Sequence, residues 1–321
     1  MSFAEQSVQV CDAPRYDATL GAWMLTRHAD VAAALREPAL SMSDGDVADL
    51  PTFAAAQLAT WRDGAESSAR RMVASLPTGE PVDLVRAFAA PWSLALACDV
   101  TGASSAHAPR LAALARAVFL AAAHATDASL APDAHRAVAA LAAALPATPL
   151  AVQAFVALTQ TLPCTLAGAW HALLAHPDQA RLLRAEPALL PRAVDELLRH
   201  AGPSRAVFRR ARADVAIGGA HVAAGDRVAL MLSAANHDPA RFPDPWRLDV
   251  RRRTAGHVAL GGGAHACAGG SVVRVALSVA TGALLDAAAV IEPAGEPTWL
   301  GGFAIRGVAS LPVVLRASPS S

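Results

Sequence analysis

Residues 260–270, Leu260-Gly261-Gly262-Gly263-Ala264-His265-Ala266-Cys267-Ala268-Gly269-Gly270, place one cysteine in a loop of small residues. The apolar stretch 271–288 that follows predicts a long helix. Backbone amides at the start of such a helix point toward the sulfur of Cys267, and the positive end of the helix dipole favours a thiolate. The small neighbouring residues leave room for a large flat group to approach that sulfur.

Other kinds of loop share parts of this pattern. A flexible glycine turn with an incidental thiol fits the spacing equally well. A phosphate-binding loop does not fit because no lysine follows the glycines, and in a dinucleotide-binding loop the third glycine would fall on Ala266. A zinc site is disfavoured because His265 and Cys267 have no second ligand pair at a recognised spacing.

The composition predicts a mainly helical protein. Of the 321 residues, 54% are hydrophobic but only 5% are aromatic, which favours close-packed helices over sheets. The 27 basic residues are all arginine and equal the 27 acidic ones, so the balance argues against a nucleic-acid partner. Four scattered cysteines indicate no disulfide framework and favour a reducing cytoplasm. Because no signal peptide and no run of 18 apolar residues is visible, we expect no membrane attachment.

Working outward from the cysteine loop, the pattern predicts one mainly helical domain over residues 1–321 with a small β portion and no internal repeat. The tail 303–316 alternates like a hairpin. A helix over 31–36 is expected to be capped by Asp30, and one over 53–74 to break near Gly64. Further helices are expected at 81–96, 109–145 (one or two, around Pro132), 150–176 (interrupted at Pro163), 180–183, 191–200 and 271–288, and strands at 22–26, 207–210, 215–217 and 227–232.

Charged residues elsewhere are ordinary when taken singly. Glu196 and Arg199 stand three residues apart on a helix, where such pairs are usually solvated. Arg247 follows the proline-rich stretch 242–245, Arg209 lies in a predicted strand and Arg70 on an early helix. Taken alone, these arginines indicate only a charged surface.

Their order along the chain resembles the cytochrome P-450 family of heme-thiolate enzymes, bacterial soluble type. The cysteine loop of that family matches at Leu260, Gly261, Gly263, His265, Cys267 and Gly269. Its Glu-x-x-Arg helix matches at Glu196 and Arg199, and its meander arginine at Arg247. Further matches are the stretches 235–239, 242–245, 306–313 and the opening 16–36.

The resemblance implies a cytochrome P-450 fold that binds heme b. Cys267 would be the thiolate ligand of the iron, and amides near Gly269 would hydrogen-bond its sulfur. His265, Arg209 and Arg70 would neutralise the heme propionates. Glu196, Arg199 and Arg247 would form a buried structural triad. Substrate would lie beside residues 204–207 and 303–305.

The chain departs from the family pattern at several places. Leu260 stands where an aromatic residue is usual, and Glu66 where a histidine or tryptophan precedes the propionate arginine. In the distal helix Thr161 is kept, but Gln160 replaces a carboxylate and Leu158 a glycine, so the usual proton route is in doubt. Residues 102–150 are short for the lid (F/G helix) region, which predicts an open pocket or one completed by a partner chain as a homodimer.

The resemblance implies a cytoplasmic oxidase or monooxygenase that acts on a small molecule, in bacterial secondary-metabolite biosynthesis. Thr161 and Gln160 would line the oxygen side. Electrons would come from a ferredoxin and its reductase, with Arg251, Arg252, Arg253 and Arg274 as candidate contacts. Two alternatives stay open: a non-oxygenative or peroxide-dependent heme enzyme (dehydratase, isomerase or nitrene-type catalyst), which Gln160 suggests, and a heme-binding scaffold or sensor without turnover.

Overall fold

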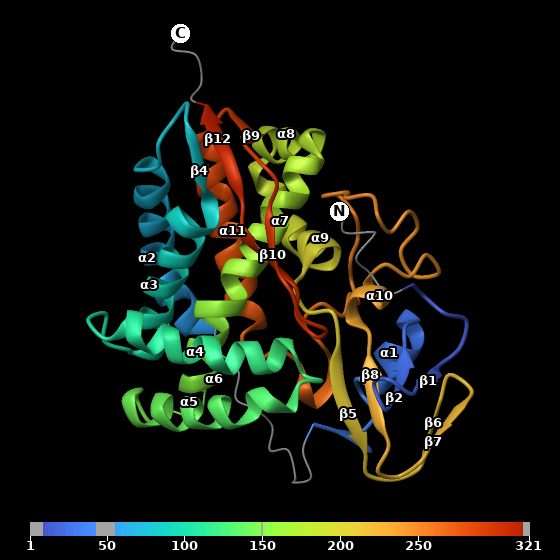
Figure 1. The fold of residues 1–321 in the computed structure, drawn as a ribbon. Coiled ribbons are helices and arrows are strands. Elements are labelled where there is room, and N and C mark those ends of the chain that lie inside the picture. The colour runs from blue at the N-terminus through green and yellow to red at the C-terminus, as the bar shows by residue number, and fades with distance from the viewer. Residues whose placement is uncertain (1–8, 43–54, 149, 317–321) are drawn as a thin grey trace.

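Most helices form in alanine- and leucine-rich stretches, because these two residues have high helix propensities. The computed structural model describes residues 9–42, 55–148 and 150–316, in which a helical bundle is flanked by small sheets (Figure 1). The helices are α1 His28–Ala34, α2 Ala55–Ala74, α3 Ala90–Thr101, α4 Ala108–Ala123, α5 Ala131–Ala144, α6 Ala151–Val156, α7 Leu162–Ala175, α8 Pro177–Ala185, α9 Leu190–Ala201, α10 Leu232–Asn236 and α11 Gly270–Ala287.

Four small sheets complete the described part of the chain. The largest has the strand order β1-β2-β8-β5-β3, with β2 and β8 parallel and the other pairs antiparallel. The others pair β4-β12-β9, β10-β11 and β6-β7. The strands are β1 Arg15–Asp17, β2 Ala22–Leu25, β3 Leu40–Ser41, β4 Pro81–Asp83, β5 Val207–Ala211, β6 Val215–Ile217, β7 Ala220–Val222, β8 Arg227–Leu230, β9 Val290–Pro293, β10 Thr298–Leu300, β11 Gly307–Ser310 and β12 Pro312–Arg316.

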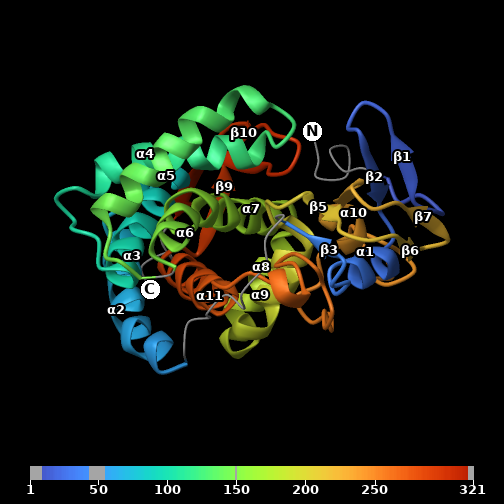
Figure 2. The same ribbon diagram turned by 90° about the horizontal axis from the view of Figure 1, so that it is seen from below.

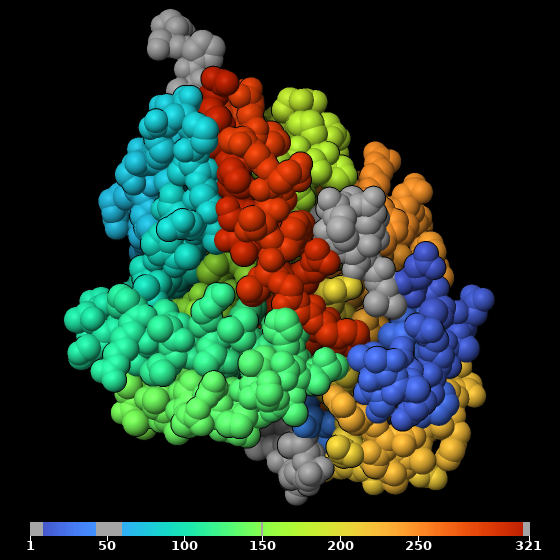
Figure 3. Space-filling view, viewed as in Figure 1, coloured from blue at the N-terminus to red at the C-terminus, as the bar shows by residue number. Residues whose placement is uncertain are grey.

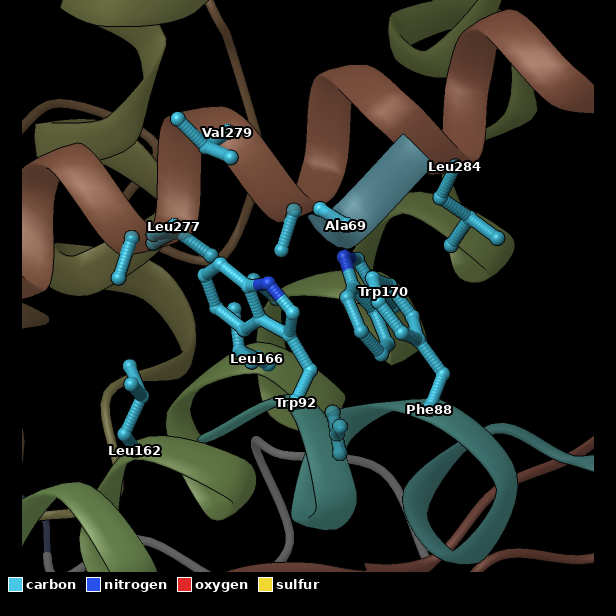
Figure 4. Close-up of a cluster of buried hydrophobic side chains, with 14 of the residues drawn as sticks. Ala69, Phe88, Trp92, Leu162, Leu166, Trp170, Leu277, Val279 and Leu284 are labelled. Carbon is cyan, nitrogen blue, oxygen red and sulfur yellow. The ribbon is translucent and has the colours of Figure 1, made fainter. Parts of the chain in front are cut away.

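The main core lies where α2, α3, α7 and α11 meet (Figure 4). Phe88 stacks on Trp170 with ring centroids 5.5 Å apart, and Trp92 packs beside them. The indole N–H of Trp92 donates to the Ser68 hydroxyl at 3.1 Å, so this ring is buried without losing its hydrogen bond. The large aromatic side chains of the bundle therefore pack in its main core. On one face of the molecule, the C-terminal strands form a band (Figure 3).

The predicted fold class is confirmed, and several element boundaries need correction. Helix α2 runs through Gly64 because Ala65 and Ala69 are buried in the core on its inner face. Asp30 lies inside α1, where it accepts from Arg27, rather than at its N-cap. Residues 81–83 form a strand because they pair with β12. The tail is no hairpin, since β11 pairs with β10 while β12 pairs with β9 and β4.

The short region 102–150 still contains two helices. Helices α4 and α5 lie side by side across α6 and the following helical turn (Figures 1 and 2). Among the described residues, one helix, α11, is long and apolar enough to cross a membrane, but more than half of it is buried inside the protein. It packs against α2, α7 and α9, as expected for a core helix.

Candidate functional site

A cavity of about 360 Å³ lies beside the cysteine loop. Its walls come from the α6–α7 segment, the end of α9, strand β5, the cysteine loop and the first turn of α11. Most of the lining side chains are apolar. The polar and sulfur-containing lining residues are Met42, Gln153, Thr161, Thr165, Ser204, Arg209, His265 and Cys267.

Glycine shapes the cysteine loop. Gly261 and Gly263 have φ of 71° and 65°, a left-handed backbone that other residues rarely adopt. A Cβ on Gly263 would lie 2.2 Å from the Leu35 carbonyl oxygen, so this part of the loop touches the end of α1 directly. The Cys267 N–H donates to the Leu260 carbonyl at 2.9 Å, which turns the chain toward α11. The predicted loop before a long helix is confirmed, with α11 starting at Gly270.

Cys267 is exposed where it borders the cavity, yet the surrounding walls exclude enough water to raise the pKa of its thiol. A hydrogen bond from the Gly269 backbone and the charge of Arg274 lower that pKa and offset part of this effect. The Gly269 amide therefore acts in the expected direction, but burial outweighs it for the sulfur by itself. A cation bound to it would reverse the balance, because a coordinated thiol loses its proton.

Arg209 brings an unbalanced positive charge to the cavity wall. Arg209 is 3% exposed. Its Nη1 donates to the Phe208 carbonyl at 2.9 Å, and its Nε has no hydrogen-bond partner among the described residues. Burial lowers the pKa of this guanidinium, and no acidic group among the described residues opposes the shift. His265 lies nearby, and burial followed by the charge of Arg209 lowers its pKa. This pair fits a ligand that carries acid groups.

Arg70 is not brought to this cavity. Helix α2 packs along α11, and Arg70 forms ion pairs with Glu66 at 3.1 Å and Asp286 at 2.9 Å near the far end of α11. Its side chain is half exposed and is not part of the cavity wall. The expectation that Arg70 would contact the same acid groups as Arg209 is corrected accordingly.

The distal helix contains a π-helical turn, Ala157–Thr161, between α6 and α7. Pro163 follows it and has no N–H to donate, in line with the predicted interruption of the helix. Thr161 lines the cavity, and the Thr165 hydroxyl donates to the Thr161 carbonyl at 2.9 Å. Gln160 does not line it: its amide donates to the Ala112 carbonyl of α4 at 3.1 Å. The expectation that Gln160 borders the oxygen side is thus corrected.

The Glu196–Arg199 pair is buried rather than solvated. Arg199 donates to both Glu196 oxygens at 2.7 and 2.9 Å, and its Nη1 reaches the Asn236 and Pro245 carbonyls. The third member is Arg252, whose Nε lies 3.1 Å from Glu196 Oε1. Arg247, the residue expected there, is exposed and supplies only a carbonyl to Arg252.

Sequence reasoning also missed residues of the wall. Thr165 follows Thr161 by four residues, and this spacing predicts that both lie on the same face of the helix. Gln153 and Met42 had no comparable signal. Ser204 and Val207 line the cavity as expected, but residues 303–305 do not, since Ile305 bridges to Ser204 outside the wall.

Comparisons with known proteins agree on one family. A sequence profile described as Cytochrome P450 matches residues 181–297. Cytochrome P450 monooxygenase PikC of Streptomyces venezuelae is 42% identical over 163 residues, which are 49% of this chain and 39% of that protein. The match thus spans less than half the length of this curated relative.

Solved structures extend the likeness over nearly the whole chain. The versatile cytochrome P450 enzyme CYP109B1 from Bacillus subtilis is 22% identical and shares the fold with a TM-score of 0.83, over 94% of this chain and 96% of that one. The LnmA cytochrome P450 hydroxylase from the leinamycin biosynthetic pathway of Streptomyces atroolivaceus S-140 is 29% identical, with a TM-score of 0.71, over 91% and 90% of the two chains.

Proposed function

Because this chain belongs to the cytochrome P450 family, we propose that it is a heme-thiolate monooxygenase acting on a small molecule. The observation that carries the proposal is the sulfur of Cys267 at the wall of a 360 Å³ cavity, together with the buried Arg209 on the same wall, which pairs with no acid among the described residues. The named role of LnmA in a biosynthetic pathway supports a place in bacterial secondary metabolism.

The residues of the cavity fit the heme b of the family. Cys267 would hold the iron, and Arg209 with His265 would pair with the two propionates, which would satisfy the unpartnered Nε of Arg209. Leu260 and Gly261 line the same wall without bulky polar groups, so a flat ring can lie against them. When bound, heme supplies the activation of dioxygen that inserts one oxygen atom into a substrate.

The chain's own residues position the substrate and hold a proton. Leu158, Leu162 and Val207 form an apolar wall that excludes water, and none of the described lining residues is a carboxylate. We therefore expect a neutral, largely apolar substrate. The Thr161 hydroxyl is the group on the distal helix that would hold a proton in the cavity, with Thr165 one turn further on.

The lack of a carboxylate in the described wall favours a second candidate. A heme enzyme that uses peroxide, or one that isomerises or dehydrates its substrate, needs no proton relay from that wall to dioxygen. Since Gln160 is engaged with α4, it does not replace the missing acid.

For electron supply we propose a ferredoxin-type donor and a cytoplasmic setting, as for soluble bacterial members of the family. The predicted docking arginines are partly engaged within the chain. Arg251 pairs with Glu186, Arg252 with Glu196 and Arg274 with Asp195. Arg253 is exposed and is the best candidate contact of the four. The homodimer stays a prediction.

The reduced, carbon-monoxide-bound absorption spectrum of protein reconstituted with hemin tests the cysteine ligand. We expect a thiolate-type band that Cys267→Ser abolishes, and a colourless protein would contradict the proposal. Consumption of NADPH and dioxygen with a ferredoxin system then separates the candidates. Coupled consumption supports the monooxygenase, product without dioxygen supports the second candidate, and ligand-induced spectral shifts without product under any supply support a sensor.

A further inference from the structure

A second cavity, of about 160 Å³, lies at the other end of α11. It is lined by Thr281, Leu284 and Leu285 of α11, whereas the first cavity touches Val272 and Val273. Helix α7, helix α8, the start of β9 and Leu84 contribute to the remaining walls. Helix α8 and β9 lie together at this end of the molecule (Figure 1). Val273 and Thr281, the nearest lining residues of the two cavities on α11, are eight residues apart, so at 1.5 Å per residue they are separated by roughly 12 Å.

The interior of this cavity suits hydrocarbon. Leu84, Leu173, Leu284 and Ile291 are among its walls. Away from the arginines of the rim, the Trp170 indole N–H donates to the Thr281 hydroxyl at 3.1 Å, so these two polar groups are already paired. An apolar cavity of about 150 Å³ in another protein stays dry and takes up benzene. A group the size of one aromatic ring therefore fits here.

The rim of the cavity is cationic. Arg181 and Arg184 are three residues apart on α8, so both are on the side of the helix that borders the cavity. Arg184 is half-buried, and its Nε donates to the Leu285 carbonyl at 3.1 Å. Burial alone lowers the pKa of this guanidinium, and neither arginine forms an ion pair with any described residue. The terminal nitrogens of Arg184 can donate to both oxygens of a planar carboxylate.

We propose that this second cavity binds a small apolar carboxylate, with a ring-sized hydrocarbon inside and the carboxylate on Arg184 and Arg181. The ligand would contact the far ends of the two helices that border the first cavity, since α7 follows the turn containing Thr161 and α11 follows Cys267. The site does not depend on the proposed monooxygenase activity.

Calorimetric titration of the heme-loaded protein with phenylacetate tests the site, with and without saturating imidazole to occupy the heme pocket. We expect one site that imidazole does not block, with the heme absorption band unchanged. The neutral analogue 2-phenylethanol and the variant Arg184→Gln should each bind about tenfold more weakly or worse, the loss of a charge-assisted hydrogen bond. Ala180→Phe should fill the cavity and abolish binding, with Ala180→Leu as a milder version should the larger residue impair folding.

Arg110→Gln removes an exposed arginine on α4 and is the matched control, expected to bind like the unmodified protein. No binding of phenylacetate, equal binding by Arg184→Gln and Arg110→Gln, or displacement by imidazole would overturn the proposal. The heme-free chain can be titrated in the same way, so a failure of the proposed function leaves this test intact.

Discussion

Arg209 lies buried on β5, and no carboxylate in the described part of the chain pairs with it. An unpaired buried charge is costly in the chain alone, and an anionic ligand would offset that cost. We predict that Arg209→Leu leaves the heme-free protein at least as stable but weakens heme binding about tenfold to a hundredfold, the loss of one or two charge-assisted hydrogen bonds. Absorbance titration with hemin measures this. Arg210→Leu, which removes the exposed neighbour, is the control, and equal affinities would contradict the role of Arg209.

Glu196 forms ion pairs with both Arg199 and Arg252, so these two arginines share it as their counter-charge. Glu196→Gln leaves Arg199 and Arg252 without their counter-charge, and we expect it to lower the free energy of unfolding by about 3–5 kcal/mol. By contrast, Arg247→Ala should change it by less than about 0.5 kcal/mol, because that side chain is exposed. Urea unfolding measures the free energy of unfolding of both variants and of Arg252→Ala. A larger loss for Arg247→Ala than for Arg252→Ala would restore the family-based assignment.

At the scale of elements, the π-helical turn is tied to α4 through Gln160. Restoring the family's acid with Gln160→Glu would therefore place a carboxylate against the Ala112 carbonyl, which cannot donate to it. We predict that this variant lowers the free energy of unfolding by about 1–3 kcal/mol and does not improve coupling of NADPH use to product. Unfolding and product assays measure both. A stable, better-coupled Gln160→Glu enzyme would show that this side chain can turn into the cavity.

Two buried histidines meet where α9 ends and the chain leaves α10. His200 and His237 have ring centroids 5.8 Å apart, and burial lowers their pKa to about 4 and about 3. Unfolding frees each to protonate near its ordinary pKa of about 6.5, so stability is full above that pH and falls as the pH drops toward 4. At pH 5 we expect a loss of roughly 1–2 kcal/mol per histidine relative to pH 7.

Urea unfolding at several pH values checks this dependence. His237→Phe, which keeps a ring against Trp246, should flatten it. The exposed His135→Phe should not. Equal slopes for the two variants would assign the acid sensitivity to other groups.

Over the whole molecule, contacts join the helical bundle to the sheet region at several points. Ser204, just before β5, bridges Ile305, and the cysteine loop before α11 touches Leu35 at the end of α1. We predict that residues 1–321 unfold as one cooperative domain, with coincident transitions by far-UV circular dichroism and tryptophan fluorescence. Two separated transitions would instead divide the chain into independently folding parts.

The sequence was enough for the features that depend on local pattern. Periodicity and proline placed most helices, and the order of the motifs identified the family, because the cysteine loop and the Glu196–Arg199 helix are continuous in the chain. Side-chain partners across the fold were less predictable. Arg252 and Arg247 stand five residues apart in one meander, and only its folded path decides which reaches Glu196. The wrong position predicted for Arg70 has a similar cause, because neither helix sequence indicates that α2 packs against α11.

The contact between Gly263 and the end of α1 has a practical consequence. Since the Leu35 backbone oxygen occupies the space where a side chain at position 263 would begin, any movement of the cysteine loop must be accompanied by movement of the end of α1. Bleaching of the heme colour on heating should therefore coincide with melting of the amino-terminal region, in the same transition as the rest of the domain.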